Sequence, residues 1–166
     1  MIARLTAVAG ALVLLAACSS TPPPDAGAGA GMGGAGMGGP VGGASRFGPG
    51  SQQDLAATAG DRVFFAYDQT DISSEGQQIL QRQADWLRRY PNVSVTIEGH
   101  ADERGTREYN LALGERRATA VKNVLVAAGI PASRIQTISY GKERPIVTGS
   151  SEESYAQNRV AITQVN

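Results

Sequence analysis

The stretch from residue 19 to residue 50 most constrains what this chain can fold into. It consists mainly of glycine, alanine, methionine, proline and serine, with Pro22-Pro23-Pro24 near its start. It has very few of the β-branched and aromatic side chains that build a core, so it cannot offset the entropy lost on ordering. We therefore predict a flexible linker over residues 18–52, which confines any globular fold to residues 53–166.

The residues before the linker have the pattern of a secretory signal peptide. Arg4 supplies a positive charge, and residues 5–17 are nearly all apolar. As a helix this run would be about 20 Å long, too short for a hydrocarbon core of roughly 30 Å. Residues 1–17 are therefore predicted to be a signal peptide and not a membrane span. No other segment of the sequence is apolar enough to cross a bilayer.

The signal peptide ends in Leu15-Ala16-Ala17-Cys18, which resembles a bacterial lipobox. In such a motif the chain is cut before the cysteine, and the cysteine is then acylated. The alternative is an ordinary signal peptide with an incidental cysteine, but Cys18 is the only cysteine of the chain. Two or more acyl chains anchor a protein stably. Ser19 follows the cysteine, where aspartate would indicate inner-membrane retention, so an outer-membrane location is predicted.

Composition argues against several other classes of function. Fifteen basic residues balance fifteen acidic ones, so no overall field attracts nucleic acid, and only 5% of residues are aromatic. One cysteine and one histidine make a transition-metal site improbable on composition. Residues 29–34 match a dinucleotide-binding glycine pattern by letter, but they follow no strand and open no helix. We therefore expect no metal and no cofactor.

Residues 53–166 show alternating strand and helix patterns. Strands are predicted at 62–67, 92–98, 134–140 and 159–165. A helix capped by Ser73 or Ser74 is predicted to run to Tyr90, another to run from Thr106 to Gly129, and a helical turn to span 151–157. This alternation predicts an α/β fold, a two-layer sandwich with helices packed on one face of a mixed four-stranded sheet.

Two charged residues in this domain are candidates for a binding site. Asp102 lies in a polar loop after a predicted strand, and Arg117 lies within the following helix. They could form a salt bridge between loop and helix, which spacing alone favours. They could instead bind the ammonium and the carboxylate of one amino acid head. His100 is expected to hydrogen-bond backbone. No activated nucleophile is visible, so the chain is not predicted to be an enzyme.

Several sequence motifs, in the same order along the chain, resemble those of the OmpA-like peptidoglycan-binding domain. Among proteins with this domain, they are most similar to the lipoproteins of the Tol–Pal system. They are Val63-Phe64-Phe65-Ala66-Tyr67-Asp68, Glu98 to Thr106, Tyr109 to Ala118, Ser139 to Pro145, and Tyr155 to Arg159. The resemblance covers residues 62–166 together with the lipobox. It departs at Val160, where this family usually has a second arginine.

The resemblance implies that Asp102 and Arg117 bind meso-diaminopimelate of the peptidoglycan stem peptide, in a pocket that Tyr67, Asp68 and Leu113 also line. It further implies an outer-membrane tether to the cell wall that meets TolB and other Tol proteins and acts in cell division. Helical geometry points Arg116 to solvent. Two alternatives stay open: a lipoprotein that anchors another envelope machine, such as a stator or secretion system, and, less favoured, an envelope enzyme.

Overall fold

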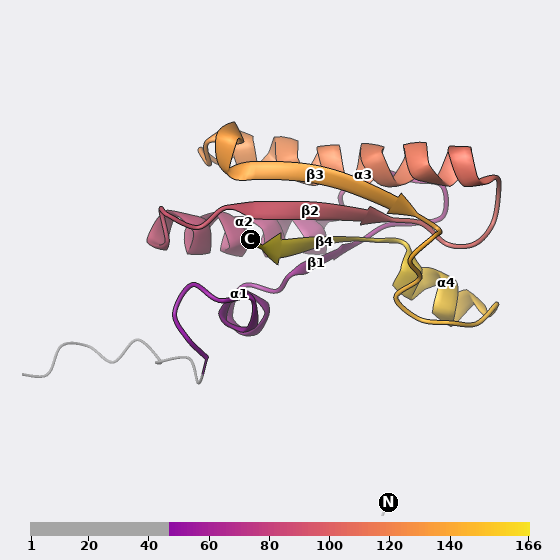
Figure 1. Cartoon of the computed structure of the whole chain (residues 1–166), viewed down its shortest axis with the longest axis horizontal. Helices are drawn as coiled ribbons and strands as arrows, with labels where there is room; N and C mark the ends of the chain where they lie inside the picture. The colour runs from indigo at the N-terminus through magenta and orange to yellow at the C-terminus, as the bar shows by residue number, and fades with distance from the viewer. Residues whose placement is uncertain (1–46) are drawn as a thin grey trace, which may run out of the picture. The chain divides into compact units, whose positions relative to one another are not determined.

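The computed structural model describes residues 47–166, which form a mixed four-stranded sheet (Figure 1). Its strands are β1 (Arg62–Phe64), β2 (Val95–His100), β3 (Ile135–Gly141) and β4 (Val160–Val165), in the order β1-β4-β2-β3. β2 pairs with β3 in parallel, and β4 pairs with both β1 and β2 in antiparallel fashion. The predicted signal peptide, Cys18 and most of the predicted linker lie outside the described residues.

Two long helices cover one face of this sheet (Figure 1). The helical elements are α1 (Gln52–Thr58), α2 (Ser74–Arg89), α3 (Arg107–Ala127), the short 3-10 helix η1 (Ala132–Arg134) and α4 (Glu152–Asn158). The predicted α/β sandwich with a mixed four-stranded sheet is therefore confirmed. None of the helices between residues 47 and 166 is long and apolar enough to cross a membrane.

Side-chain caps begin the helices where the sequence predicted them. The Ser73 hydroxyl accepts a hydrogen bond from the Gly76 N–H, and the Thr106 hydroxyl accepts one from the Tyr109 N–H. Such caps satisfy backbone donors that have no partner within the helix. Gly129, with φ of 93°, follows the end of α3.

The core lies between the sheet and the two long helices. Val95 and Ile97 alternate with more exposed neighbours along β2, and both are fully buried. The apolar stripe of α2, formed by Leu80, Ala84 and Leu87, is also fully buried. The α3 residues Ala118, Val121 and Leu125 belong to the same buried cluster.

The structure differs from the sequence predictions at three places. Strand β1 ends at Phe64, whereas the prediction continued to residue 67. A turn follows at residues 67 and 68, in which Asp68 has a positive φ of 55°. Helix α1 was not predicted. It is held to α2 by a hydrogen bond from the Trp86 indole to the Asp54 carboxylate at 3.0 Å. Strand β2 runs from Val95 to His100, whereas the prediction ran from residue 92 to residue 98.

Strand β2 and helix α3 approach each other through two glycines. A Cβ atom on Gly99 would lie 1.9 Å from the carbonyl oxygen of Gly114, and one on Gly114 would lie 2.7 Å from the carbonyl oxygen of Gly99. Neither position has room for a side chain, so the two backbones are in direct contact. The close approach of helix and sheet thus explains why both positions are glycine.

Candidate functional site

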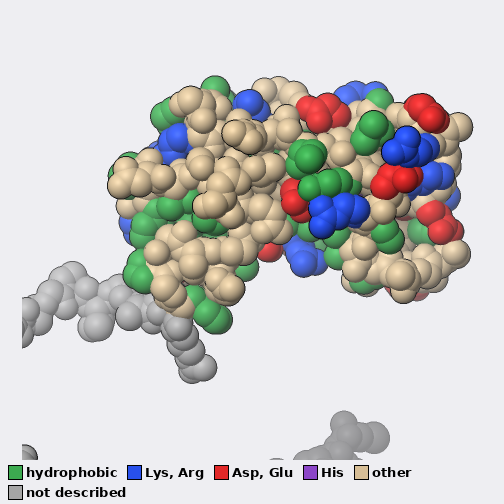
Figure 2. Space-filling model, viewed as in Figure 1, with side chains coloured by type: hydrophobic (Ala, Val, Ile, Leu, Met, Phe, Trp, Pro, Cys, Tyr) green, Lys and Arg blue, Asp and Glu red, His purple; other side chains and the backbone are tan. Residues whose placement is uncertain are grey.

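A cavity of about 190 Å³ opens where β2 ends and α3 begins. Its lining comprises Tyr67, Asp68, Asp102, Arg104, Gly105, Tyr109, Asn110, Leu113 and Arg117. The structure thus places all five pocket residues predicted from the sequence around one cavity, together with four others. Figure 2 shows side chains of both charges gathered at the end of the domain where α4 lies, which is also the end to which β2 and β3 point in Figure 1.

Arg117 forms the buried, positively charged part of this cavity. Its side chain comes from α3 and donates three hydrogen bonds to backbone carbonyl oxygens. The acceptors are Gln69 at 3.0 Å, His100 at 2.8 Å and Ala66 at 3.2 Å. A guanidinium has five N–H donors, so two are left for a ligand. Burial lowers the pKa of Arg117 to about 10, and the group therefore stays charged at neutral pH.

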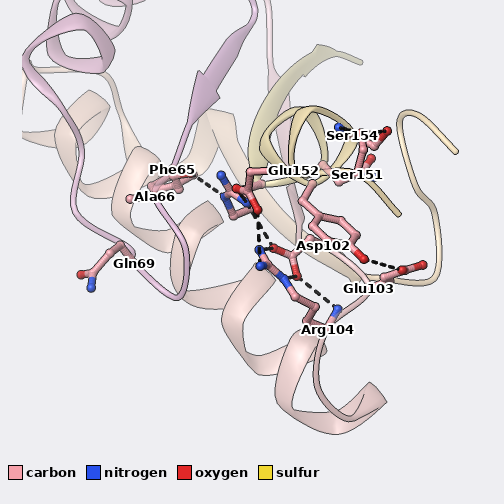
Figure 3. Close-up of polar contacts among 12 residues, drawn as sticks. Phe65, Ala66, Gln69, Asp102, Glu103, Arg104, Ser151, Glu152 and Ser154 are labelled. Carbon is pink, nitrogen blue, oxygen red and sulfur yellow. Dashed lines mark hydrogen bonds and ion pairs between the residues drawn. The ribbon is translucent and has the colours of Figure 1, made fainter. Parts of the chain in front are cut away.

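Asp102 supplies the negative charge of the cavity and is only 4% exposed. The Arg104 side chain donates to both of its carboxylate oxygens, from Nη2 to Oδ2 at 2.6 Å and from Nε to Oδ1 at 3.2 Å (Figure 3). Burial opposes the charge of Asp102, but hydrogen bonds from the Arg104 side chain and backbone outweigh it and lower the pKa of this carboxyl. The carboxylate is therefore held in its charged form.

Arg104 lies over Asp102 and is partly exposed. Its guanidinium is 4.2 Å from the ring centre of Tyr67 and 4.4 Å from that of Tyr155, so two aromatic faces enclose it. Its Nη1 lies 3.4 Å from a carboxylate oxygen of Glu152 at the start of α4. The hydrogen bond to Asp102 raises the pKa of Arg104. From the sequence, Arg104 was recognised only as part of a motif, and no role was predicted for it.

Arg159 approaches Asp102 from the buried side. Its Nη1 lies 3.4 Å from Asp102 Oδ2 and 2.8 Å from a carboxylate oxygen of Glu152, and its Nε donates to the Phe65 carbonyl oxygen at 3.1 Å. These contacts join the C-cap of α4, the residue that follows β1 and the Asp102 loop. From the sequence, Arg159 was recognised as part of a motif that resembles the family, but it was not predicted to contact the pocket.

Asp102 and Arg117 are not paired with each other. Within the described residues Asp102 has ion pairs to Arg104 and Arg159, whereas Arg117 is held by backbone carbonyls. A direct salt bridge between loop and helix, which spacing alone favoured, is therefore absent from this part of the chain. The two charges are fixed independently and both face the cavity.

Aromatic and apolar side chains form the mouth and wall of the cavity. Tyr67 and Tyr109 are exposed, at 59% and 45%, whereas Leu113 is buried. The Tyr109 hydroxyl donates to the Asp68 carboxylate, and this hydrogen bond raises the pKa of Tyr109. Asn110 donates to the Arg104 carbonyl oxygen at 2.9 Å, and this hydrogen bond ties the loop to the first turn of α3.

Two further predictions are confirmed near the site. Arg116 points to solvent, and its guanidinium lies 5.9 Å from the centre of the Tyr109 ring. His100 is buried, and its Nδ1 forms the expected hydrogen bond to backbone, with the Arg144 carbonyl oxygen at 3.0 Å. No group of three potential metal ligands occurs among residues 47–166.

The cavity can accommodate a small group that carries both charges. The Asp102 carboxylate can accept hydrogen bonds from an ammonium, and the two remaining N–H groups of Arg117 can donate to a carboxylate. Leu113 and the tyrosine rings offer apolar surface to an aliphatic chain. The arrangement therefore suits the zwitterionic head of an amino acid.

Comparison with known proteins assigns the family. Residues 64–159 match the model of the OmpA family, and the chain belongs to this family. A relative from Agrobacterium fabrum named peptidoglycan-associated lipoprotein is 58% identical over 123 residues, which cover 74% of this chain and 70% of the relative. A relative of the same name from Haemophilus influenzae is 43% identical and covers 93% of this chain and 92% of its own length.

Solved structures agree with this assignment. The crystal structure of the peptidoglycan-associated lipoprotein from Burkholderia pseudomallei has a TM-score of 0.62 and 40% identity, and covers 64% of this chain and 90% of that one. The C-terminal domain of Helicobacter pylori MotB has a TM-score of 0.60 at 22% identity, covers 64% of this chain and 84% of that one, and so shares the fold. The prediction that the chain is not an enzyme agrees with its family, whose relatives are named for association with peptidoglycan.

Proposed function

We propose that this chain is an outer-membrane lipoprotein that binds peptidoglycan non-covalently through meso-diaminopimelate and thereby tethers the membrane to the cell wall. The observation that carries the proposal is the cavity in which Asp102 and Arg117 are held separately with opposite charges. The names of the relatives support the same ligand class.

In this proposal the free amino acid head of diaminopimelate enters the cavity. Its ammonium binds Asp102, its carboxylate binds the two remaining N–H groups of Arg117, and its aliphatic chain lies against Leu113. Tyr67 and Asp68 bound the mouth. Because Arg104 occupies both oxygens of Asp102 in the free chain, the ligand ammonium has to take over part of that contact.

Stem peptides with different third residues test the ligand. Lysine has an amine where meso-diaminopimelate has a second amino acid head, so it offers Arg117 no carboxylate. A charge-assisted hydrogen bond is worth about 1.5–3 kcal/mol, so the lysine peptide should bind about tenfold to a hundredfold more weakly. Titration calorimetry with the two peptides measures this ratio. Equal affinities would refute the proposed site.

The predicted N-terminal segments complete the tether. We propose that residues 1–17 are removed as a signal peptide, that Cys18 is acylated, and that residues 18–52 link the lipid to the peptidoglycan-binding domain, residues 53–166, in the periplasm. A linker of this length reaches about 100 Å when stretched and spans roughly 30 Å as a glycine-rich coil. That reach is sufficient for the domain to leave the membrane surface.

Replacing the proposed lipid acceptor tests the anchor. Cys18→Ser should leave the protein without acyl chains and outside the outer-membrane fraction, because no other segment predicted from the sequence would hold it there. Growth with labelled palmitate, followed by membrane fractionation, measures both effects. Label that persists in the variant would contradict lipidation at Cys18.

The partners proposed for this tether are TolB and the other Tol proteins, with a role in envelope integrity and cell division. Support comes from the phrase Ala101 to Thr106 and from relatives up to 58% identical that are named peptidoglycan-associated lipoprotein. The alternative of anchoring a stator or secretion machine has less support, because the likeness to MotB, at 22% identity, extends to the fold alone.

A further inference from the structure

Strand β3 is an unprotected edge of the sheet. It pairs with β2 on one side and has no strand on the other within residues 47–166. Its seven residues, Ile135–Gly141, include no proline and no charged side chain, and Ile138 is 39% exposed. Edge strands are usually shortened, charged or covered, because their free N–H and C=O groups can pair with another chain. The opposite edge strand, β1, has only three residues and carries Arg62.

Helix α3 extends beyond this edge. Glu108, Leu111, Ala112 and Glu115 follow one another at helical spacing and, with Thr137, Ile138 and Ser139, line a groove of about 570 Å³. We call these four helix residues the outer stripe. Leu111 is 42% exposed although it faces the sheet edge. Part of α3 therefore lies beyond the edge of the sheet and has no strand beneath it. A strand added next to β3 would bury Leu111 and Ala112.

The charges of the outer stripe define what can bind there. Glu108 and Glu115 lie at its two ends, about 10 Å apart at 1.5 Å per residue, with the apolar pair between them. Alternate residues of a strand that face the same side are about 6.7 Å apart, so three of them span this stripe. We therefore consider an extended segment in which three alternate residues face α3 and are basic, apolar and basic in turn. The basic residues would meet the two glutamates, and the apolar residue would contact Leu111 and Ala112.

Two other occupants fit less well. A second copy paired through β3 about a twofold axis would bring the two outer stripes face to face, and their glutamates would repel each other. The predicted linker of this chain has a single basic residue before residue 50, Arg46, and therefore cannot supply two. We propose that the groove between β3 and α3 binds an extended segment of another protein, which adds a fifth strand to the sheet and directs basic side chains to Glu108 and Glu115.

Two short peptides test this inference independently of peptidoglycan binding. The probe acetyl-Thr-Lys-Thr-Val-Thr-Lys-Thr-amide has the required inward pattern, and its control carries glutamate in place of both lysines. Added to the isotope-labelled full chain in detergent micelles, the lysine peptide should bind with submillimolar affinity. It should shift the resonances of Leu111 and Ile138 and slow amide exchange along β3. The glutamate peptide should bind at least about tenfold more weakly, because two exposed attractions become repulsions.

Reversing the charges of the protein provides the matched variant. The double substitution E108K/E115K should exchange the preference, so that the glutamate peptide binds and the lysine peptide does not; this exchange also shows that the variant is folded. Unchanged preference in the variant, no effect on β3 at millimolar peptide, or association of the chain with itself through β3 would each overturn the proposal. Because diaminopimelate peptides occupy a different cavity, their binding should be the same in both proteins.

Discussion

Asp102→Asn should reduce the affinity for stem peptides that contain meso-diaminopimelate by about 30-fold to several thousand-fold. Removing one partner of a desolvated charge pair costs about 2–5 kcal/mol, and each 1.4 kcal/mol is tenfold in affinity. The amide keeps the shape of the side chain, but Arg104 and Arg159 then repel the ligand ammonium without a carboxylate to balance them. Titration calorimetry of the variant and the parent protein measures the loss.

Asp68→Asn is the matched control for this substitution. Asp68 lies at the exposed mouth of the same cavity, where its carboxylate accepts a hydrogen bond from Tyr109. Removing an exposed charge should weaken binding less than tenfold. Similar losses in the two variants, or parental affinity in Asp102→Asn, would show that Asp102 is not the ammonium receptor.

Binding should also resist moderate acid. Hydrogen bonds from Arg104 overcome the effect of burial and hold the pKa of Asp102 below its usual value of 3.8. A carboxyl with a lowered pKa stays ionised as pH falls and loses its charge only when pH passes below that pKa. The Asp102 contribution to affinity should therefore change little from pH 7 to about pH 5 and decline at lower pH. Titrations at several pH values would contradict this if affinity already fell markedly between pH 7 and about pH 5.

Arg117→Met should lower the free energy of unfolding by about 3–5 kcal/mol. The substitution removes three hydrogen bonds from a charged donor, to the carbonyl oxygens of Ala66, Gln69 and His100, and such bonds contribute about 1.5–3 kcal/mol each. Relief from burying a guanidinium offsets part of this cost. Urea unfolding followed by circular dichroism measures the change. A loss below about 1 kcal/mol would mean that the three hydrogen bonds are not structural.

Arg116→Met is the control for the stability effect. Arg116 is the next residue of α3 but points to solvent, so its loss should change the unfolding free energy by no more than about 0.5 kcal/mol. Because Arg117 supports the fold as well as the cavity, a binding loss in its variant has two causes. Asp102→Asn is for this reason the more decisive test of the ligand.

The sequence predicted the parts of this structure that depend on local patterns. The capped helices, the alternating strand β2 and the stripe of α2 follow from the spacing of apolar residues and from Ser73 and Thr106. Helix α1 was missed because only Leu55 and Asp54 of its seven residues are buried, which gives it no apolar stripe. The predicted first strand extended beyond the end of β1 because Phe65 is apolar. In the structure Phe65 is buried, but it lies after the strand.

The site was predictable only in part, because its charges meet through the fold. Resemblance supplied the five predicted lining residues, which the structure places around one cavity. The contacts of Asp102 with Arg159 join residues 57 positions apart, and no local pattern indicates them. The contact between Asp102 and Arg104 could have been predicted from the sequence. The two residues are two positions apart in one loop, so their side chains can reach each other.

The contact between Gly99 and Gly114 lies close in sequence to both charged residues of the cavity. Gly99 precedes Asp102 by three residues, and Gly114 precedes Arg117 by nearly one helical turn. The backbone segments that lead to the two charged residues therefore lie as close together as direct backbone contact permits. Substitution of either glycine by alanine would place a methyl group between the two backbones and would move β2 and α3 apart, together with the charged residues that follow them. In the proposed function, the backbone segments that carry the ammonium-binding and carboxylate-binding groups are therefore held at a fixed separation in the free protein.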